Sequence, residues 1–251
     1  MSFFKYGICH LLNYIHALFN KIFIIGYYPR VWAEGHVVPL HRKGSIDSVE
    51  NYRGITLLSH IGKLFTRILN NRLTTWAENY HVYIEAQAGF RKEMGTMDNI
   101  FVIKGIINHM LNSNKQLFVA WVDYKKAYGF VVRENMWYKL VKYEVRGNIL
   151  NSIKSMYEHG KSRVKFDNQP SESYASTLGL AQGECLSSFL FSFYINDIEE
   201  TLSSQGFKGI DLGMAKMYLL LYADDIVLFS ELEEDLQNGI DILYDYCLRW
   251  K

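Results

Sequence analysis

The stretch LYADDIVLFS, residues 221–230, places two adjacent carboxylates in the middle of an apolar, strand-like run. Burying an ionised carboxylate costs free energy unless the group is paired or binds a metal ion. Two carboxylates side by side also repel each other, and each raises the pKa of the other. Asp224 and Asp225 therefore require either a solvent-exposed turn, where Asp is common, or a cation.

A second apolar run, LFVAWVDYKKAY at residues 117–128, also has a carboxylate, Asp123, at the end of its strand-like part. Two such strands can converge on neighbouring positions in a sheet and direct Asp123 and Asp225 toward one point. A cluster of this kind suits one or two Mg²⁺ ions, which prefer carboxylate oxygens and keep positions open for phosphate. Paired metal ions can activate an attacking hydroxyl and stabilise a leaving pyrophosphate. The two runs thus indicate phosphoryl transfer, with a plain hairpin turn as the alternative.

The bulk composition is that of a folded protein. The chain has 251 residues, 49% of them hydrophobic and 21% charged, enough for one large core or two lobes around a cleft. No apolar run reaches the roughly 18 residues that span a membrane, and the first segment lacks a signal-peptide pattern. Cys9, Cys185 and Cys247 are far apart and odd in number, which indicates reduced intracellular thiols rather than disulfides or a zinc site.

The net charge of +1 conceals an uneven distribution. Residues 1–170 hold 23 Lys and Arg against 12 Asp and Glu, whereas residues 171–251 hold 4 against 14. A basic N-terminal part and an acidic C-terminal part fit a protein that binds a polyanion at one surface and concentrates cations at another. Two oppositely charged lobes that attract each other would give the same pattern.

Hydrophobic periodicity and turn residues divide the chain into helices and strands that interleave without strict βαβ repetition. Helices are expected at 8–25, 60–79, 97–113, 186–203 and 231–251, and residues 133–158 are expected to be mostly helical. Strands are expected at 37–40, within 117–128, in a hairpin over 163–177 with its turn at DNQP, and as two short strands over 216–230. This order predicts an α+β domain over an antiparallel sheet.

Six segments together resemble the reverse transcriptase domain of non-LTR (LINE-type) retrotransposons. They occur in the family's order over about residues 20–230, and they are PRVWAEGHVVPLHRKGS, NYRGITLLSHIGKLFTRILNNRL, QAGFRKEMGTMDNI, VDYKKAY, GLAQGECLSSFLFSFYINDI and YADDIVLFS. YADD alone is a weak signal, whereas six blocks in register are not a chance similarity.

The resemblance implies a right-hand polymerase fold, with fingers and a palm whose antiparallel sheet is backed by helices. Residues from about 1 to 115 would form an N-terminal helix and the fingers, and residues from about 116 to 251 the palm with some finger elements. The chain stops at LRWK, where the family continues into another palm motif and the thumb. A C-terminally truncated domain with the thumb absent is therefore expected.

By the same resemblance, Asp123, Asp224 and Asp225 correspond to the three catalytic carboxylates of the palm. In that family they hold two Mg²⁺ ions, with Mn²⁺ as a substitute, and join a primer 3′-hydroxyl to an incoming deoxynucleoside triphosphate. The implied partners are an RNA template, a DNA primer and dNTPs, with no membrane. The implied location is the nucleus or a cytoplasmic ribonucleoprotein.

Five further residues match substrate-binding positions of the family. Lys43 and Arg53 correspond to basic residues that grip the triphosphate. Tyr128 corresponds to the aromatic residue that packs under the sugar and excludes a 2′-hydroxyl. Gln182 matches a glutamine that lines the nucleotide pocket, and Gly183 permits close backbone approach. Solvated surface charges, a core or rim tyrosine and an ordinary loop amide are the alternatives.

Three basic residues are expected to contact nucleic acid, where each basic contact adds salt-dependent affinity. They are Arg91, Lys125 and Lys126, and an exposed position without a ligand is the alternative for each. Trp121 and Trp137 are expected in the core rather than as base-stacking platforms.

Two departures from the family pattern bear on activity. Gly129 follows KAY where the family usually has Asp, which could loosen the turn beside Asp123. Ser188 takes the place of a proline, which frees the backbone ahead of a helix.

The predicted function is RNA-directed DNA polymerase, and the alternative is a catalytically inactive, decayed or domesticated fragment that binds nucleic acid or a protein partner. Another palm-type nucleotidyltransferase, such as a cyclase, would need no primer–template, and the finger and QG segments argue against it.

Overall fold

The computed structural model describes residues 2–166, 169–213 and 215–251, and the chain divides into two compact units. The first unit comprises Met1–Leu69, Leu140–Thr177 and Ala181–Cys185, and the second comprises Asn70–Lys139, Leu178–Leu180 and Leu186–Lys251. Each unit therefore combines segments that are far apart in the sequence. Two helices, α2 (His60–Asn79) and α4 (Arg133–Lys142), contribute residues to both units.

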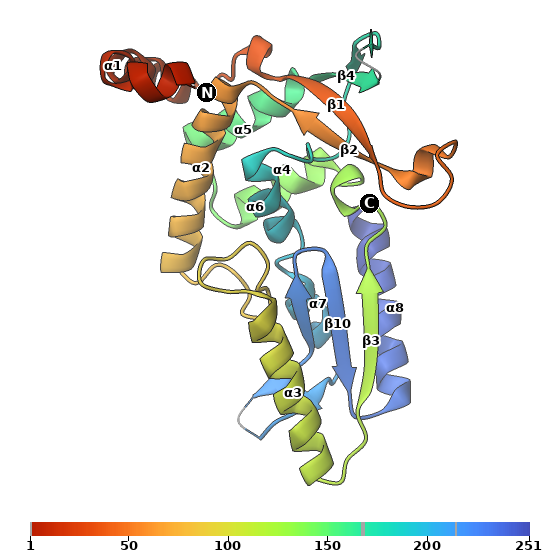
Figure 1. The fold of residues 1–251 in the computed structure, drawn as a ribbon. Helices are drawn as coiled ribbons and strands as arrows, with labels where there is room; N and C mark the ends of the chain where they lie inside the picture. The colour runs from red at the N-terminus through yellow and green to blue at the C-terminus, as the bar shows by residue number, and fades with distance from the viewer. Residues whose placement is uncertain (1, 167–168, 214) are drawn as a thin grey trace. The chain divides into compact units, whose positions relative to one another are not determined.

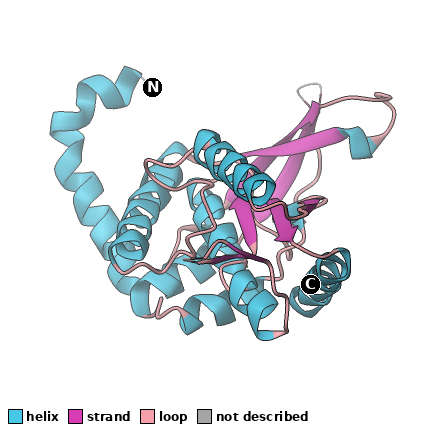
Figure 2. Ribbon diagram, turned by 90° about the horizontal axis from the view of Figure 1, so that it is seen from below, coloured by secondary structure: helices cyan, strands magenta, loops and turns pink. Residues whose placement is uncertain are grey.

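The first unit is built on a sheet with the strand order β2-β1-β4-β5, in which β6 also pairs with β4. Its strands are β1 (Glu34–His41), β2 (Tyr52–Leu57), β4 (Lys161–Phe166), β5 (Gln169–Pro170) and β6 (Tyr174–Ala175). Its other elements are α1 (Ser2–Ile25), α5 (Gly147–Glu158) and the short helices η1 (Arg30–Trp32) and η2 (Val49–Asn51). Figure 2 shows α1 as one continuous helix from the N terminus, and α1 contacts α5.

Aromatic packing connects α1, η1 and α2 within this unit. The rings of Phe19, Tyr28, Trp32 and Phe65 lie with centroids 5.4–6.5 Å apart in tilted or edge-on pairs. Edge-to-face pairs contribute about 0.5–1.5 kcal/mol each beyond the burial of their area. The backbone N–H of Tyr28 also donates to Ser155 Oγ at 2.9 Å, which ties the same cluster to α5.

The second unit is built on a three-stranded antiparallel sheet with the order β3-β10-β9 (Figure 1). Its strands are β3 (Phe118–Asp123), β9 (Leu219–Tyr222) and β10 (Asp225–Ser230), with a separate pair of β7 (Ile210–Asp211) and β8 (Lys216–Met217). Its other elements are α3 (Thr96–Asn112), η3 (Ala127–Gly129), α6 (Cys185–Tyr194), α7 (Ile198–Ser204) and α8 (Glu233–Trp250). Helix α8 contacts β10, β3 and α7, and α3 contacts β9.

The apolar sequence of β10 explains its central place in this sheet. A strand covered on both faces has a continuous apolar run rather than an alternating one, and residues 226–229 are all buried. One cluster joins the strands to α3 and comprises Ile106, Met110, Leu220, Val227 and Phe229. Burying a side chain of this size contributes about 1.5–3 kcal/mol. Only the first residue of the strand, Asp225, is exposed.

Most expected elements occur at the expected residues, and helices and sheets together form a mixed α/β fold. The expected helices at 60–79, 97–113 and 231–251 are α2, α3 and α8, and residues 133–158 form α4 and α5. Of the turn expected at DNQP, Asp167 and Asn168 lie outside the described residues. None of the described helices is long and apolar enough to cross a membrane.

Three expectations were wrong in part. Residues 186–203 form two helices because the chain leaves the helix at 195–197, where the buried side chains of Asn196 and Asp197 bond to other segments. The first sheet is not wholly antiparallel, since β1 and β4 are parallel. Ser188 lies inside the first turn of α6 rather than ahead of the helix.

Candidate active site

The turn between β9 and β10 places the acidic pair beside the end of β3. Asp225, the first residue of β10, is directly opposite Asp123, the last residue of β3, in the antiparallel register. Residues opposed in this way have Cβ atoms about 4.5–5.5 Å apart. Asp224 lies in the turn, after Ala223, whose φ of 60° is in the left-handed region. Carboxylates from two distant segments are therefore neighbours at the ends of adjacent strands.

The three carboxylates form a concentration of negative charge. Partial burial raises the pKa of Asp225, and the charges of Asp224 and Asp123 raise it further. Within the described part of the chain, no basic side chain forms an ion pair with any of the three. The same part contains no group of three or more His, Cys, Asp or Glu side chains arranged to hold a metal ion. Binding by all three carboxylates would thus require their side chains to turn toward the cation.

The sheet face that carries Asp123 and Asp225 also carries an exposed tryptophan. Side chains alternate across a strand, so Trp121 and its register partner Val227 share this face with the two carboxylates. A cavity of about 430 Å³ borders the face, and Trp121, Asp123 and Asp225 contribute to its lining. Trp121 is 70% exposed, so the expectation that it lies in the core was wrong. Trp137 is 9% exposed and lies in the core as expected.

The loop after β3 presents two lysines and buries the predicted tyrosine. Lys125 and Lys126 are exposed, and Lys126 has a φ of 57°. The ring of Tyr128 is 8% exposed and stacks on Phe191 of α6, with centroids 5.0 Å apart and planes 25° from parallel. The backbone carbonyl of Tyr128 accepts a hydrogen bond from Leu180 N at 2.7 Å. The tyrosine is therefore fixed both by its ring and by its backbone.

Three of the predicted substrate-binding residues meet inside the first unit. Arg53 of β2 donates from Nε to Gln182 Oε1 at 3.0 Å. The Gln182 carbonyl accepts from Thr56 N at 2.7 Å, which joins this loop to the edge of β2. Gly183 has a φ of +104°, and a Cβ there would lie 2.8 Å from Thr56 O, so both backbone conformation and space require glycine.

Lys43 and Arg91 are in different surroundings. Lys43 is exposed in the loop that follows β1. Arg91 makes a two-bond pair with Glu78, at 3.0 and 2.7 Å, which raises the pKa of the guanidinium. Its other donors reach the carbonyls of Ile84 and Gln87, and its guanidinium lies over the ring of Tyr83. Arg91 thus braces the loop that follows α2, and its contact with nucleic acid stays a prediction.

A family model described as reverse transcriptase (RNA-dependent DNA polymerase) matches residues 41–251. The chain belongs to this reverse transcriptase family. It is 25% identical over 246 residues to the RNA-directed DNA polymerase from mobile element jockey of Drosophila funebris, which covers 95% of this chain and 26% of that protein. It is 26% identical over 227 residues to the retrovirus-related Pol polyprotein from the type-1 retrotransposable element R2 of Nasonia vitripennis, covering 90% of this chain and 22% of that protein. The chain is thus a reverse transcriptase domain of the non-LTR type, and it spans about a quarter of the length of these curated relatives.

Solved structures agree with this fold. An apo telomerase from Candida tropicalis, truncated from its C-terminal domain, has a TM-score of 0.62 at 14% identity and covers 86% of this chain and 47% of that one. A telomerase from Candida albicans in complex with the TWJ fragment of telomeric RNA has a TM-score of 0.61 at 15% identity. The match covers 84% of this chain and 38% of that one. At these identities the likeness concerns the fold alone.

The reverse transcriptase domain contains one residue beside the acidic pair that sequence reasoning missed. Gln87 is 1% exposed, and its side-chain amide bonds to the backbone of Ala223, the residue before Asp224. It lies in the segment QAGF, which carried part of the family resemblance. The available signal was a polar amide inside the apolar run AQAGF, because a buried amide must find hydrogen-bond partners.

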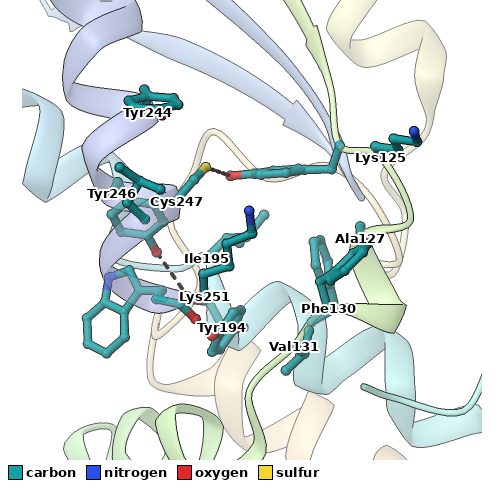
Figure 3. A pocket seen from close by; sticks show the side chains of 14 residues that line it. Lys125, Ala127, Phe130, Val131, Tyr194, Ile195, Tyr244, Tyr246, Cys247 and Lys251 are labelled. Atoms are coloured by element: carbon teal, nitrogen blue, oxygen red, sulfur yellow. Dashed lines mark hydrogen bonds between the residues drawn. The ribbon is translucent and has the colours of Figure 1, made fainter. Parts of the chain in front are cut away.

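Behind the loop that follows Asp123, the reverse transcriptase domain has an apolar cavity of about 350 Å³ (Figure 3). Its walls come from that loop, from α6 and from the end of α8, and they include Phe130, Tyr194 and Trp250. Tyr124 also lines it, and the Cys247 thiol approaches the Tyr124 hydroxyl at 3.6 Å. Burial raises the pKa of the Cys247 thiol, which favours its neutral form.

Proposed function

We propose that this domain extends a DNA primer on an RNA template with dNTPs, and that Asp123, Asp224 and Asp225 hold two Mg²⁺ ions, or Mn²⁺ in their place. The observation that carries the proposal is the register pair Asp123–Asp225 with Asp224 in the adjoining turn. Membership of the reverse transcriptase family supports the reaction class. The raised pKa of Asp225 supports the cation, because crowded carboxylates without basic partners are stabilised by a hard metal ion.

When bound, the metal ions would activate the primer 3′-hydroxyl and neutralise the leaving pyrophosphate. The chain's own contribution is rigidity, because phosphoryl transfer depends mainly on positioning and charge neutralisation. The backbone pairing of β3 with β10 fixes the spacing of Asp123 and Asp225, and the apolar residues after Asp225 anchor the strand in the core. The carboxylates of Asp123 and Asp225 are exposed at the ends of these strands, where water and substrate can reach them.

The unit with the β3-β10-β9 sheet is proposed as the palm of a right-hand polymerase, and the unit with β1, β2 and β4 as the fingers. This proposal differs from the boundary expected near residue 115, because residues 70–115 belong to the unit with the β3-β10-β9 sheet. In the fingers, Lys43 and Arg53 are proposed to bind the triphosphate, and Gln182 and Gly183 to line the nucleotide pocket. The hydrogen bond from Arg53 to Gln182 supports a shared role for these two side chains. The two terminal amino groups of the Arg53 guanidinium are outside that bond and suit phosphate oxygens.

In the palm, Tyr128 is proposed to exclude a 2′-hydroxyl from the sugar site. Its stacking on Phe191 supports this role, because a side chain that excludes a 2′-hydroxyl by steric clash must keep its position when the nucleotide binds. Lys125 and Lys126 are exposed beside the end of β3, which supports a contact with the phosphate backbone. A place in the nucleus or in a cytoplasmic ribonucleoprotein is proposed from family membership alone.

Primer extension on an oligo(dT)-primed poly(A) template tests this function, with Mg²⁺ and dTTP, and with Asp225→Asn run beside the wild type. We expect extension by the wild-type chain and none by the variant. A folded wild-type chain that does not extend the primer would contradict the proposal and favour a domain that only binds nucleic acid.

A further inference from the structure

The turn that carries the acidic pair has an unusual backbone. Ala223 lies between Tyr222 and Asp224 with a φ of 60°, a conformation that residues with a Cβ rarely adopt. Asn or Asp in this conformation can stabilise it with its own side chain, whereas alanine has no polar group to do so. Ala223 is also 6% exposed, so its backbone N–H and C=O require partners from the protein.

The side chain of Gln87 supplies both partners. Its Oε1 accepts from Ala223 N at 3.0 Å, and its Nε2 donates to Ala223 O at 3.3 Å. The same Oε1 accepts from Gly89 N at 2.8 Å. The side-chain amide of Gln87 therefore bonds to both the backbone N–H and the backbone C=O of Ala223, as the peptide group of a neighbouring strand would.

The backbone around Gln87 is held against β9 as well. Leu221 N donates to Ala86 O at 2.8 Å, and Ala88 N donates to Leu221 O at 3.0 Å. A Cβ on Gly89 would lie 2.1 Å from Ala223 N, so the chain passes too close to the turn for any side chain there. Gln87 thus forms an isolated parallel bridge with Leu221 of β9, and its side chain reaches the turn.

We propose that Gln87 is a positioning residue for the acidic pair: it holds Ala223 in the left-handed conformation so that β10 begins at Asp225, opposite Asp123. This inference rests on the proposed function of the carboxylates. Without the Gln87 amide, Ala223 can relax, and the two aspartates lose their fixed direction relative to Asp123. The expected consequence is weaker divalent-metal binding and a slower chemical step, with little change in dNTP affinity.

A matched control is available in the same unit. Asn196 is 3% exposed, accepts from Ile84 N at 3.0 Å and donates to Val82 O at 2.7 Å. It therefore makes the same kind of amide-to-backbone pairing, but it does not touch Ala223. Asn196→Leu should destabilise the fold about as much as Gln87→Met does, without affecting the acidic pair.

The first readout is amide hydrogen exchange on the metal-free chain. In Gln87→Met, exchange of the Ala223 amide should rise at least tenfold while that of Ile84 is unchanged, and Asn196→Leu should give the reverse. Gln87→Asn keeps the amide but shortens the side chain, so it should show a smaller rise at Ala223 and serves if Gln87→Met does not fold.

The second readout is Mn²⁺ binding by water proton relaxation, together with primer extension kinetics. Gln87→Met should raise the Mn²⁺ dissociation constant and the Mg²⁺ concentration for half-maximal extension severalfold, and lower kcat at least tenfold, with KM for dTTP within twofold. Gln87 variants that match Asn196→Leu in metal binding and kcat would overturn the inference. Wild-type chain that binds Mn²⁺ but does not extend primer would instead overturn the proposed function, and the Mn²⁺ measurement would still test Gln87.

Discussion

Asp123 and Asp225 stand directly opposite each other at the ends of two adjacent antiparallel strands. Like charges in this relationship destabilise a sheet, and the neighbouring Asp224 adds to the repulsion. No basic side chain among the described residues forms an ion pair with either carboxylate, so the repulsion lowers the stability of the sheet. This cost is typical of functional sites, where charge is arranged for a ligand rather than for the fold.

Asp225→Asn should therefore abolish primer extension and at the same time stabilise the fold. Removing one of two opposed charges should raise the free energy of unfolding by about 0.2–1 kcal/mol at low salt, and less when salt screens the pair. Urea unfolding and primer extension on the same preparation measure both effects. A variant that still extends primer would remove Asp225 from the proposed metal site.

The stabilisation by Asp225→Asn should depend on pH. The folded-state pKa of Asp225 is raised, so its charged form opposes folding above that pKa, and protonation relieves the repulsion as the pH falls. The advantage of the Asn variant should be largest near neutral pH and should shrink as the pH approaches the ordinary Asp value of 3.8. An advantage that is constant between pH 7 and pH 4 would show that charge is not its cause.

Tyr128→Ala should relax discrimination against ribonucleotides, because it removes the ring that stacks on Phe191 and would meet a 2′-hydroxyl. The cavity left by a buried ring costs about 3–5 kcal/mol, so the assay belongs well below the melting temperature. Tyr128→Phe keeps the ring and should keep the discrimination. The measurement is the ratio of rNTP to dNTP incorporation, and an unchanged ratio in the Ala variant would exclude Tyr128 from the sugar site.

Lys139 should be essential for stability although it lies outside the proposed site. Its ammonium group is 0% exposed, and it donates to Asp197 Oδ1 at 2.7 Å and to the Tyr246 hydroxyl at 2.7 Å. It also lies 3.9 Å from the ring centroid of Trp250 at the end of α8. Lys139→Ala should cost about 3–5 kcal/mol because it leaves a buried carboxylate without its cation.

The double variant Lys139→Met/Asp197→Leu tests this account of Lys139 by urea unfolding. Because it removes both buried charges, it should recover most of the stability lost in Lys139→Ala. A double variant as unstable as Lys139→Ala would show that packing, rather than the unpaired charge, explains the loss.

Gly129 departs from the family pattern without a steric reason. A Cβ there would meet only Lys126 Cβ at 4.0 Å, so Gly129→Ala should stabilise the fold by about 0.4–1 kcal/mol through the unfolded state. Gly179 is the matched control, because its φ is +79° and its Cβ would lie 2.7 Å from Gly129 O. Gly179→Ala should destabilise, and thermal unfolding of both variants would separate the two cases.

Arg53 and Gln182 should be coupled in nucleotide binding. Each single change to Leu should raise KM for dTTP, and the pair should be non-additive by about 0.5–1.5 kcal/mol, the net value of a hydrogen bond. Steady-state kinetics of the two single variants and the double variant give this coupling. Single variants with the KM of the wild type would limit both residues to a structural role.

Local patterns along the chain were enough to predict most helices and strands and to identify the key carboxylates. Apolar periodicity set α2 and α3 within a residue, because amphipathic spacing is a local property. The adjacent charges of Asp224 and Asp225 in an apolar run marked the site without any knowledge of the fold. Six ordered segments indicated the reverse transcriptase family, and the family model agrees.

The contacts between distant residues could not be predicted from local patterns, because they depend on how the segments pack. The parallel pairing of β1 with β4 and the break between α6 and α7 depend on partners that no local pattern names. The same holds for Gln87, since its amide is significant only because Ala223 lies beside it with both backbone groups buried. Trp121 was misplaced because apolar sequence indicates a strand but not which of its faces is covered. Spacing and charge are encoded along the chain, whereas burial and hydrogen-bond partnership arise only when separate segments pack together.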